Sequence, residues 1–169
     1  MKRIAKFEKI SQKQFLKDFK DIYKDWYIGE EITDIYDRII LPKRATIGSA
    51  GYDIRVPFEC TVRKGDVVKI PTGIRCKMNS NYVMLIFPRS SLGIKRGLKI
   101  ANTIPVIDSD YYYADNEGHI FICIQNDKKE PLFLNKGEAI VQAVFLPYGI
   151  SEEETVVKQR SGGIGSTGE

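Results

Sequence analysis

The chain has 169 residues, of which 43% are hydrophobic and 28% charged, with 26 Lys and Arg against 22 Asp and Glu. This length fits one domain with a sizeable core, and the composition is ordinary for a soluble globular protein. A net charge of +4 tolerates a phosphate ligand but is too small to indicate a stable nucleic-acid partner. No apolar run approaches the length of a membrane span, so we expect no membrane partner.

The three cysteines, Cys60, Cys76 and Cys123, are far apart and form no C-x-x-C pair. Their odd number and their spacing predict reduced, partly buried thiols rather than a disulfide framework or a metal site. The opening segment, MKRIAKFEKISQKQ, lacks the apolar stretch of a signal peptide. Both features lead us to expect a cytoplasmic protein.

One helix is expected near the N-terminus. Ser11 and Gln14 have the spacing of a capping box, and Ile10 has that of a hydrophobic staple with Phe15. An apolar stripe at helical spacing follows, made by Phe15, Leu16, Phe19, Ile22, Tyr23 and Trp26. We expect this stripe to dock on the main domain or on a neighbouring subunit. Tyr27–Asp37 is expected to be a linker, so that residues 1–37 form a helical extension.

From Arg38 onward, short β-branched runs alternate with Gly, Pro, Asn and Asp. The predicted strands are Arg38–Leu41, Tyr52–Val56, Cys60–Val62, Asp66–Pro71, Ile74–Lys77, Val83–Phe87, Leu98–Ala101, His119–Gln125, Leu132–Leu134 and Ala139–Pro147. Many short strands separated by turns predict an all-β fold over residues 38–150, as a sandwich, jelly roll or small barrel. Residues 151–169 form a tail with little to bury, which we expect to be mobile unless a ligand or partner orders it.

Two segments in the first half of the β region can hold polar ligands. AGYDI places the carboxylate of Asp53 at the start of a strand, where an Asp is often only a turn residue. PRSSLG follows a strand and offers the guanidinium of Arg89 with the hydroxyls of Ser90 and Ser91. This donor set suits phosphate oxygens, although a surface turn can have the same residues.

Two further segments place polar groups beside apolar strands. The segment from Asn102 to Tyr111 has the sequence NTIPVIDSDY. Its apolar residues form the edge of a predicted hairpin, and the carboxylate of Asp108 and the aromatic ring of Tyr111 follow them. GEAIVQ places Gln142 in an otherwise apolar strand, where a polar side chain needs a partner. An Asp-rich turn and an ordinary satisfied amide would also account for these patterns.

The last segment, RSGGIGSTG, begins at Arg160 and is rich in glycine. It formally matches G-x-G-x-x-G, but no strand leads into it at the distance that a dinucleotide-binding fold requires. A Walker loop is excluded because no Lys follows the glycines. A Gly/Ser/Thr tail with one Arg can still wrap a polyphosphate with N–H groups, hydroxyls and a guanidinium.

Taken together and in this order, the five segments resemble the motifs of the trimeric dUTPase family, from about Leu41 to Gly168. AGYD, PRSS, IDSDY, the G-E-x-x-x-Q element and RxGGxGSTG each match a family motif, and YYYADNEG resembles an excursion in some bacterial and phage members. The resemblance implies a distorted jelly roll, a homotrimer with active sites between subunits, and hydrolysis of dUTP to dUMP and pyrophosphate with Mg²⁺. The N-terminal helix lies outside the common family core.

The resemblance also implies residue roles at the reacting centre. Asp108 would hold and activate the water that attacks the α-phosphorus, and Gln142 would lie near that water and the phosphates. Asp53 would touch Mg²⁺ through a coordinated water. The ring of Tyr111 would pack against the deoxyribose and leave no room for a 2′-hydroxyl.

The remaining substrate contacts implied by the resemblance come from three segments. The phosphate-binding set is Arg89, Ser90 and Ser91, and the hairpin that receives deoxyuridine includes Asn102 and Ile107. The tail would close as a lid over the active site through Arg160, Gly163, Ile164, Ser166 and Thr167.

Two residues depart from the family pattern. Ile164 stands where many members have Phe, so stacking over the uracil becomes aliphatic cover. Pro105 stands where the family usually has Gly, and because proline has no N–H, it cannot donate a backbone hydrogen bond to the base.

Three alternatives remain at this stage. A dCTP deaminase shares the jelly roll, but alignment through Gly118 places Cys123 where its catalytic Glu would stand. A binding or regulatory module that kept the fold and lost activity is supported by Pro105. A zinc enzyme is disfavoured because His119 is the sole histidine, and we expect His119 to be a surface or interface residue.

Overall fold

The computed structural model describes residues 2–24 and 29–155. Its helices and strands, in chain order, are β1 (Ala5–Lys9), α1 (Gln12–Tyr23), α2 (Gly29–Asp37), β2 (Lys43–Arg44), β3 (Tyr52–Arg55), β4 (Cys60–Val62), β5 (Val67–Pro71), β6 (Ile74–Met78), β7 (Tyr82–Pro88), β8 (Leu98–Ile100), β9 (Val106–Ile107), β10 (Phe121–Asn126), β11 (Leu132–Leu134) and β12 (Ala139–Pro147). A π-helical segment, Ser91–Arg96, precedes β8, and a 3₁₀ turn, Ser109–Tyr113, follows β9.

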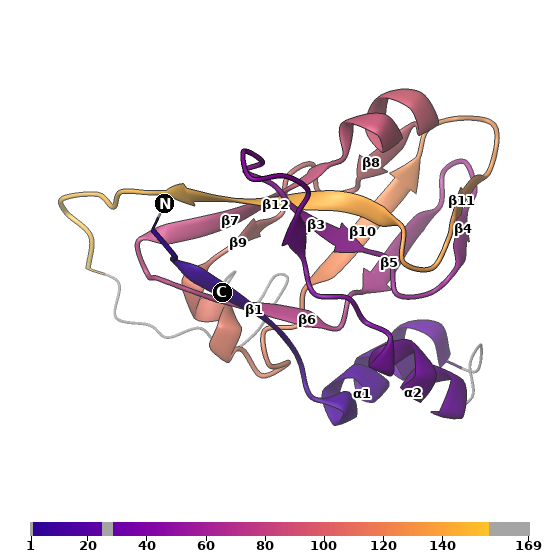
Figure 1. Cartoon of the computed structure of the whole chain (residues 1–169), viewed down its shortest axis with the longest axis horizontal. Coiled ribbons are helices and arrows are strands. Elements are labelled where there is room, and N and C mark those ends of the chain that lie inside the picture. Colours follow the sequence, from indigo (N-terminus) through magenta and orange to yellow (C-terminus); the bar gives the residue numbers. More distant parts are fainter. Residues whose placement is uncertain (1, 25–28, 156–169) are drawn as a thin grey trace.

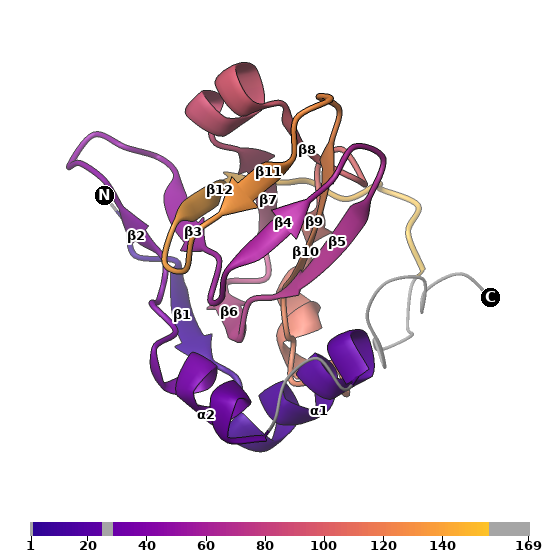
Figure 2. The same ribbon diagram turned by 90° about the vertical axis from the view of Figure 1, so that its right-hand side faces the viewer.

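The strands form small antiparallel sheets that pack around one core (Figures 1 and 2). The largest has the order β2-β3-β12-β7-β9, and a second has the order β5-β10-β8. The pairs β1-β6 and β11-β4 complete the layers, and the two helices lie together at one end of the molecule, below the sheets in Figure 2. This mostly-β architecture confirms the predicted all-β jelly roll or sandwich.

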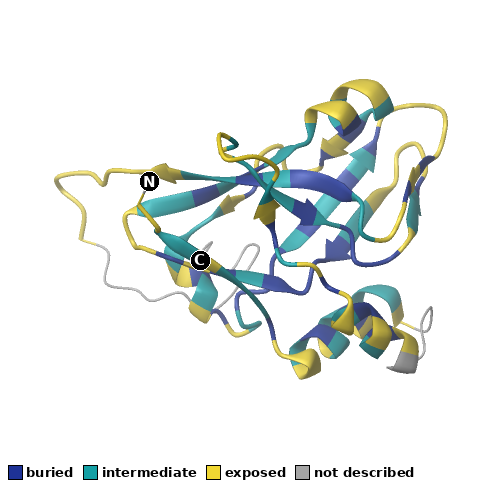
Figure 3. Cartoon of the chain, viewed as in Figure 1, coloured by how far each residue is buried: buried dark blue, intermediate teal, exposed yellow. Residues whose placement is uncertain are grey.

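The strand β12 lies at the centre of the largest sheet, because it pairs with β3 on one side and β7 on the other. Ala139, Ile140, Val141 and Ala143 on this strand are buried, and Figure 3 shows dark bands along β12. A strand that is covered on both faces reads as a continuous apolar run, and this explains why Gln142 stands out in the sequence. The polar side chain of Gln142 is therefore a local exception within the core strand.

The predicted N-terminal helix is confirmed. Ser11 is its N-cap, with the hydroxyl accepting a hydrogen bond from the backbone N–H of Gln14. Phe15 and Phe19 are fully buried, and the ring of Phe19 lies 5.1 Å from that of Phe58 in the β region. The apolar stripe therefore docks on the main domain and belongs to the same hydrophobic core. Trp26 lies outside the described residues.

The linker predicted at Tyr27–Asp37 is wrong from Gly29 onward, where α2 begins. Its Ile32 and Ile35 are buried, and Ile39 just beyond the helix is buried as well. This short apolar stripe gains its stability from packing against the core rather than from strong end signals. The strand predicted at Arg38–Leu41 is also wrong. That segment connects the end of α2 to β2 and forms no strand.

β1 was not predicted from the sequence, yet it joins the extension to the fold by pairing along β6, from Ala5 opposite Met78 to Lys9 opposite Ile74. We use the term N-terminal extension for β1, α1 and α2. On β1, the carboxylate of Glu8 lies 2.8 Å from the Lys6 ammonium and 3.2 Å from the Arg75 guanidinium. It also accepts a 2.7 Å hydrogen bond from the hydroxyl of Tyr112.

Glu8 is expected to make the protein less stable in acid. Hydrogen bonds from Lys6 and Tyr112 lower the pKa of its carboxyl from 4.5 to about 2. Because the folded state binds the proton less tightly than the unfolded state, this stabilisation is complete above pH 4.5 and is lost as the pH falls toward 2. The melting temperature of Glu8→Gln should therefore fall less steeply than that of the wild type across this window, as differential scanning calorimetry would measure. Parallel curves for the two proteins would contradict the assignment.

Candidate functional site

Three polar residues from three separate segments meet beside the central strand β12. Gln142 lies opposite Asp53 of β3 and opposite Phe87 of β7 in the strand register. Nε of Arg89, just after β7, lies 3.2 Å from Oδ1 of Asp53, and the side chain of Asp53 is only 16% exposed. The fold thus brings the first, second and fourth motif segments together, as a shared site requires.

The local backbone explains the small and polar residues of these segments. A Cβ at Gly51 would collide with Oε1 of Gln142, so any larger residue at position 51 would displace the Gln142 side chain from its present position. Nε2 of Gln142 lies 3.4 Å from the carbonyl oxygen of Pro88, which gives the polar side chain a partner inside the sheet. The backbone N–H of Arg89 donates to the carbonyl of Ile140 at 3.3 Å, which holds the segment after β7 against β12.

The hydroxyl-bearing residues of the second segment stand at its turn into the π-helical segment. Ser90 precedes Ser91–Arg96 as its N-cap, and both Ser90 and Ser91 are exposed. Exposed hydroxyls beside a guanidinium are suitable donors for the oxygens of a phosphate chain. Arg89, which contacts Asp53, is therefore followed directly by two exposed hydroxyls.

The third segment, from Asn102 to Tyr111, pairs with β7 away from the end of β7 that leads to Arg89. Asn102 is exposed in the turn after β8, and Ile107 of β9 pairs with Met84 of β7. Asp108 directly follows β9 and begins the 3₁₀ turn. Pro105 is buried, and its carbonyl accepts a hydrogen bond from the N–H of Ile86, so proline fits this position without needing its missing donor.

Asp108 and the Asp53–Arg89–Gln142 group are well separated within one chain. On β7, Gln142 is paired with Phe87 while Ile107 is paired with Met84. Three residues of a strand span roughly 10 Å, and Asp108 lies one residue further on. One chain therefore carries two parts of a site that do not meet.

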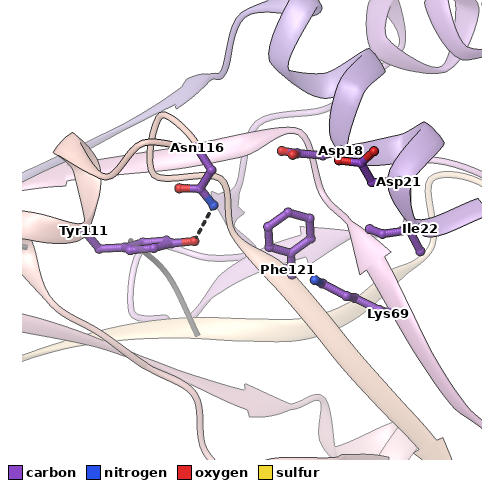
Figure 4. A pocket seen from close by; sticks show the side chains of 7 residues that line it. All are labelled: Asp18, Asp21, Ile22, Lys69, Tyr111, Asn116 and Phe121. Carbon is purple, nitrogen blue, oxygen red and sulfur yellow. Dashed lines mark hydrogen bonds between the residues drawn. The ribbon is translucent and has the colours of Figure 1, made fainter. Parts of the chain in front are cut away.

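Tyr111 is buried, with 7% of its surface exposed. Its hydroxyl donates to the carbonyl of His119 at 2.6 Å and accepts a 2.9 Å hydrogen bond from Nδ2 of Asn116. The ring borders a cavity of about 260 Å³ that Figure 4 shows, with Asp18 and Asp21 of α1 opposite Tyr111 and Asn116. Ile22, Lys69 and Phe121 line the rest of the cavity.

The prediction that His119 is a surface or interface residue is wrong, because its side chain is fully buried. Nδ1 lies 2.6 Å from Oδ2 of Asp18, and Nε2 accepts a 2.8 Å hydrogen bond from the backbone N–H of Gly73. Burial lowers the pKa of the imidazole below 6.5, against the opposing effect of Asp18. Both ring nitrogens have partners, and this makes the burial of a lone histidine tolerable.

Sequence reasoning missed Asp18 and Asn116, which the fold places beside Tyr111. Asp18 lies on the polar side of an amphipathic helix, where a charge usually faces solvent, so no sequence signal pointed to it. Asn116 lies in the segment YYYADNEG, whose sequence has neither helical nor strand periodicity. Their positions depend on how the extension packs, which only the tertiary structure reveals.

The predicted tail residues Arg160, Gly163, Ile164, Ser166 and Thr167 lie outside the described residues. Within residues 2–24 and 29–155, no three His, Cys, Asp or Glu side chains are grouped closely enough to hold a metal ion. In the same ranges, no helix has the length and apolarity needed to cross a membrane.

Comparisons with known proteins point to one family. The family model described as dUTPase matches residues 37–168. The deoxyuridine 5′-triphosphate nucleotidohydrolase of Lactococcus lactis is 41% identical over 145 residues, covering 83% of this chain and 97% of that protein. The one from Desulfitobacterium hafniense is 39% identical over 138 residues, covering 76% of this chain and 87% of that protein.

Solved structures of dUTPases share this fold. The crystal structure of dUTPase from Streptococcus mutans has a TM-score of 0.67 and 35% identity, covering 86% of this chain and 98% of that chain. The dUTPase of Staphylococcus bacteriophage 80alpha has a TM-score of 0.62 at 21% identity, covers 93% of this chain and 98% of that chain, and supports the fold alone. The family model spans most of the chain, and the polar groups of three motif segments converge in the fold, so this chain belongs to the dUTPase family.

Proposed function

We propose that this protein hydrolyses dUTP to dUMP and pyrophosphate. The observation that carries the proposal is the convergence of Asp53, Arg89 and Gln142, with Arg89 Nε 3.2 Å from Asp53 Oδ1. These neighbouring side chains on paired strands include a carboxylate, a guanidinium and an amide. Together they provide the oxygen and nitrogen groups that bind a metal-bound triphosphate. The names of the similar proteins from Lactococcus and Desulfitobacterium point to the same substrate.

In the proposed reaction, a water oxygen bonds to the α-phosphorus while the bond from that phosphorus to the α,β-bridging oxygen breaks. Asp108 takes the proton of the attacking water, which gives dUMP and pyrophosphate. Such general-base help is worth about 10²–10⁴-fold in rate. Gln142 orients the water, and Arg89, Ser90 and Ser91 bind the phosphate oxygens.

The nucleoside part of the substrate would lie along the third segment. Asn102 and the backbone near Ile107 read the uracil edge, and the ring of Tyr111 packs on the deoxyribose. Tyr111 has two hydrogen-bond partners at its hydroxyl, so the ring is held in one orientation. A fixed ring next to C2′ would exclude a 2′-hydroxyl by steric contact.

Mg²⁺ fits the residues present, as an ion held chiefly by phosphate oxygens. Asp53 supplies a hard carboxylate oxygen, and Mg²⁺ commonly keeps several waters and takes one or two carboxylates with substrate phosphates. When bound, the ion would neutralise the triphosphate and orient it for in-line attack. Asp53 would reach it through a coordinated water.

A homotrimer with shared sites is the second part of the proposal. Asp108 and the Asp53–Arg89–Gln142 group lie beside different ends of β7, so a compact substrate would reach both if they come from different subunits. Arg160, Gly163, Ile164, Ser166 and Thr167 of the tail would then close over the triphosphate as a lid.

A nucleotide panel tests the proposed activity. We expect the purified protein with Mg²⁺ to release pyrophosphate from dUTP, and far less from UTP, dTTP or dCTP, in a coupled pyrophosphate assay. Chelation of the metal with EDTA should abolish release. Binding of dUTP without turnover, measured by calorimetry, would instead favour the binding module that Pro105 suggested. Equal release from all four nucleotides would indicate an unselective pyrophosphatase.

A further inference from the structure

We propose that Asp18 of the N-terminal extension is a positioning residue that tunes discrimination between deoxyribose and ribose, acting through His119 on Tyr111. This inference rests on the proposed function, in which the ring of Tyr111 faces the sugar. Asp18 lies outside residues 37–168, which the family model matches. The extension would therefore take part in substrate selection as well as in packing.

The first link joins Asp18 to His119. The backbone N–H of Gly73 is only a donor, so the Nε2 atom that it contacts at 2.8 Å carries no proton. The proton of the neutral ring is therefore on Nδ1 and is donated to Oδ2 of Asp18, 2.6 Å away. Two directed hydrogen bonds on opposite sides of a fully buried ring leave His119 a single orientation.

The second link joins His119 to Tyr111. The backbone carbonyl of His119 accepts the 2.6 Å hydrogen bond from the Tyr111 hydroxyl. It lies 3.4 Å from Nδ2 of Asn116, which also donates to the same hydroxyl at 2.9 Å. The position of His119 therefore sets where the end of the Tyr111 ring is held.

Two other contacts hold the extension against the segment from Ser109 to His119, which we call the Tyr111 loop. Both carboxylate oxygens of Glu117 accept hydrogen bonds from Ser11, one from its N–H at 2.7 Å and one from its hydroxyl at 2.6 Å. Glu117 thus places a negative charge at the N-terminus of α1, where the helix dipole favours it. Tyr112 of the same loop donates to Glu8 of β1.

The contact between α1 and the loop is also packed. The His119 ring lies 6.1 Å from Phe15 of α1 and 4.2 Å from Phe121 of β10, measured between centroids. Oδ1 of Asp18 accepts a 2.8 Å hydrogen bond from Nε2 of Gln14, so the carboxylate itself is held in place. An unbroken series of contacts therefore joins α1 to the Tyr111 ring.

The test compares kcat/KM for dUTP with kcat/KM for UTP in Asp18→Ala. Loss of the carboxylate leaves the buried Nδ1–H without its acceptor, so His119 and the Tyr111 hydroxyl should shift. We expect the ratio to fall by roughly tenfold, since a small misplacement near the reacting groups can cost up to about 10²-fold. Asp18→Asn, which retains an oxygen acceptor, should restore most of the ratio.

Two controls separate positioning from loss of folded protein. Asp21→Ala removes an exposed carboxylate that lines the same cavity from the same helix, and it should leave the ratio unchanged. Tyr111→Ala should lower the ratio at least as far as Asp18→Ala. A purely structural role of Asp18 would lower the active fraction, which reduces both rates equally and leaves the ratio intact.

Outcomes for the two proposals are distinguishable. If Asp18→Ala keeps the wild-type ratio while the wild type hydrolyses dUTP selectively, the positioning role is refuted and the proposed function stands. If the wild type does not hydrolyse dUTP at all, the proposed function itself fails.

Discussion

Asp108→Asn is expected to lower kcat for dUTP by about 10²–10⁴-fold, the contribution of a general base. The substitution keeps the size of the side chain and removes its ability to take a proton from water. Asp108 follows β9, which pairs with β7, so the neighbouring backbone should keep its position. Single-turnover rates and calorimetric affinity for a non-hydrolysable dUTP analogue would separate chemistry from binding.

The matched control is Asp115→Asn, which changes an exposed carboxylate in the Tyr111 loop, seven residues after Asp108. It should retain wild-type turnover and the wild-type melting temperature. If Asp108→Asn also turned over at the wild-type rate, the base would have to be another group. If it lost nucleotide affinity and rate together, Asp108 would be a binding residue instead.

Mixing two inactive variants is expected to restore activity. Asp108→Asn lacks the proposed base, and Arg89→Ala lacks a phosphate donor from the distant part of the chain. If each site combines these residues from different subunits, every trimer that contains both variants should carry both intact residues in about a third of its sites. The measurement is dUTP turnover after co-expression with two different affinity tags and tandem purification.

The result depends on the separation along β7, where Gln142 pairs with Phe87 and Ile107 pairs with Met84. A control mixture of Asp108→Asn with the double variant Asp108→Asn, Arg89→Ala should stay inactive, because no subunit then provides the base. Verified mixed trimers without recovered turnover would show that both residues serve the same site from one chain. A monomer with full activity would exclude shared sites altogether.

Several structural features follow from local sequence patterns. β4, β11 and β12 have the predicted bounds, because turn residues on both sides limit the length of these mostly apolar runs. The N-cap of α1 at Ser11 is as predicted, since it is a contact between residues three apart. The reciprocal half of a capping box is not formed, because the Ser11 N–H donates to Glu117 and the Gln14 side-chain amide donates to Asp18. The jelly-roll class follows from many such strands.

Other features required the packed molecule. α2 is a short helix whose Ile32 and Ile35 are stabilised by a core that the local sequence does not contain, so a linker was the wrong prediction. His119 looked like a surface residue because a lone histidine is acceptable inside only when distant groups satisfy both nitrogens. Asp18 and Gly73 are those groups, and they come from other parts of the chain.

The sequence by itself determined the family, most of the strands and the types of polar group available to bind a nucleotide. The order and spacing of the motifs are properties of the amino-acid sequence, so they can be recognised before the fold is known. The tertiary structure alone decided that Asp53, Arg89 and Gln142 meet while Asp108 lies elsewhere, and that α1 contacts the Tyr111 loop. These relations depend on strand pairing and helix docking between residues far apart in sequence, and local propensity carries no information about them.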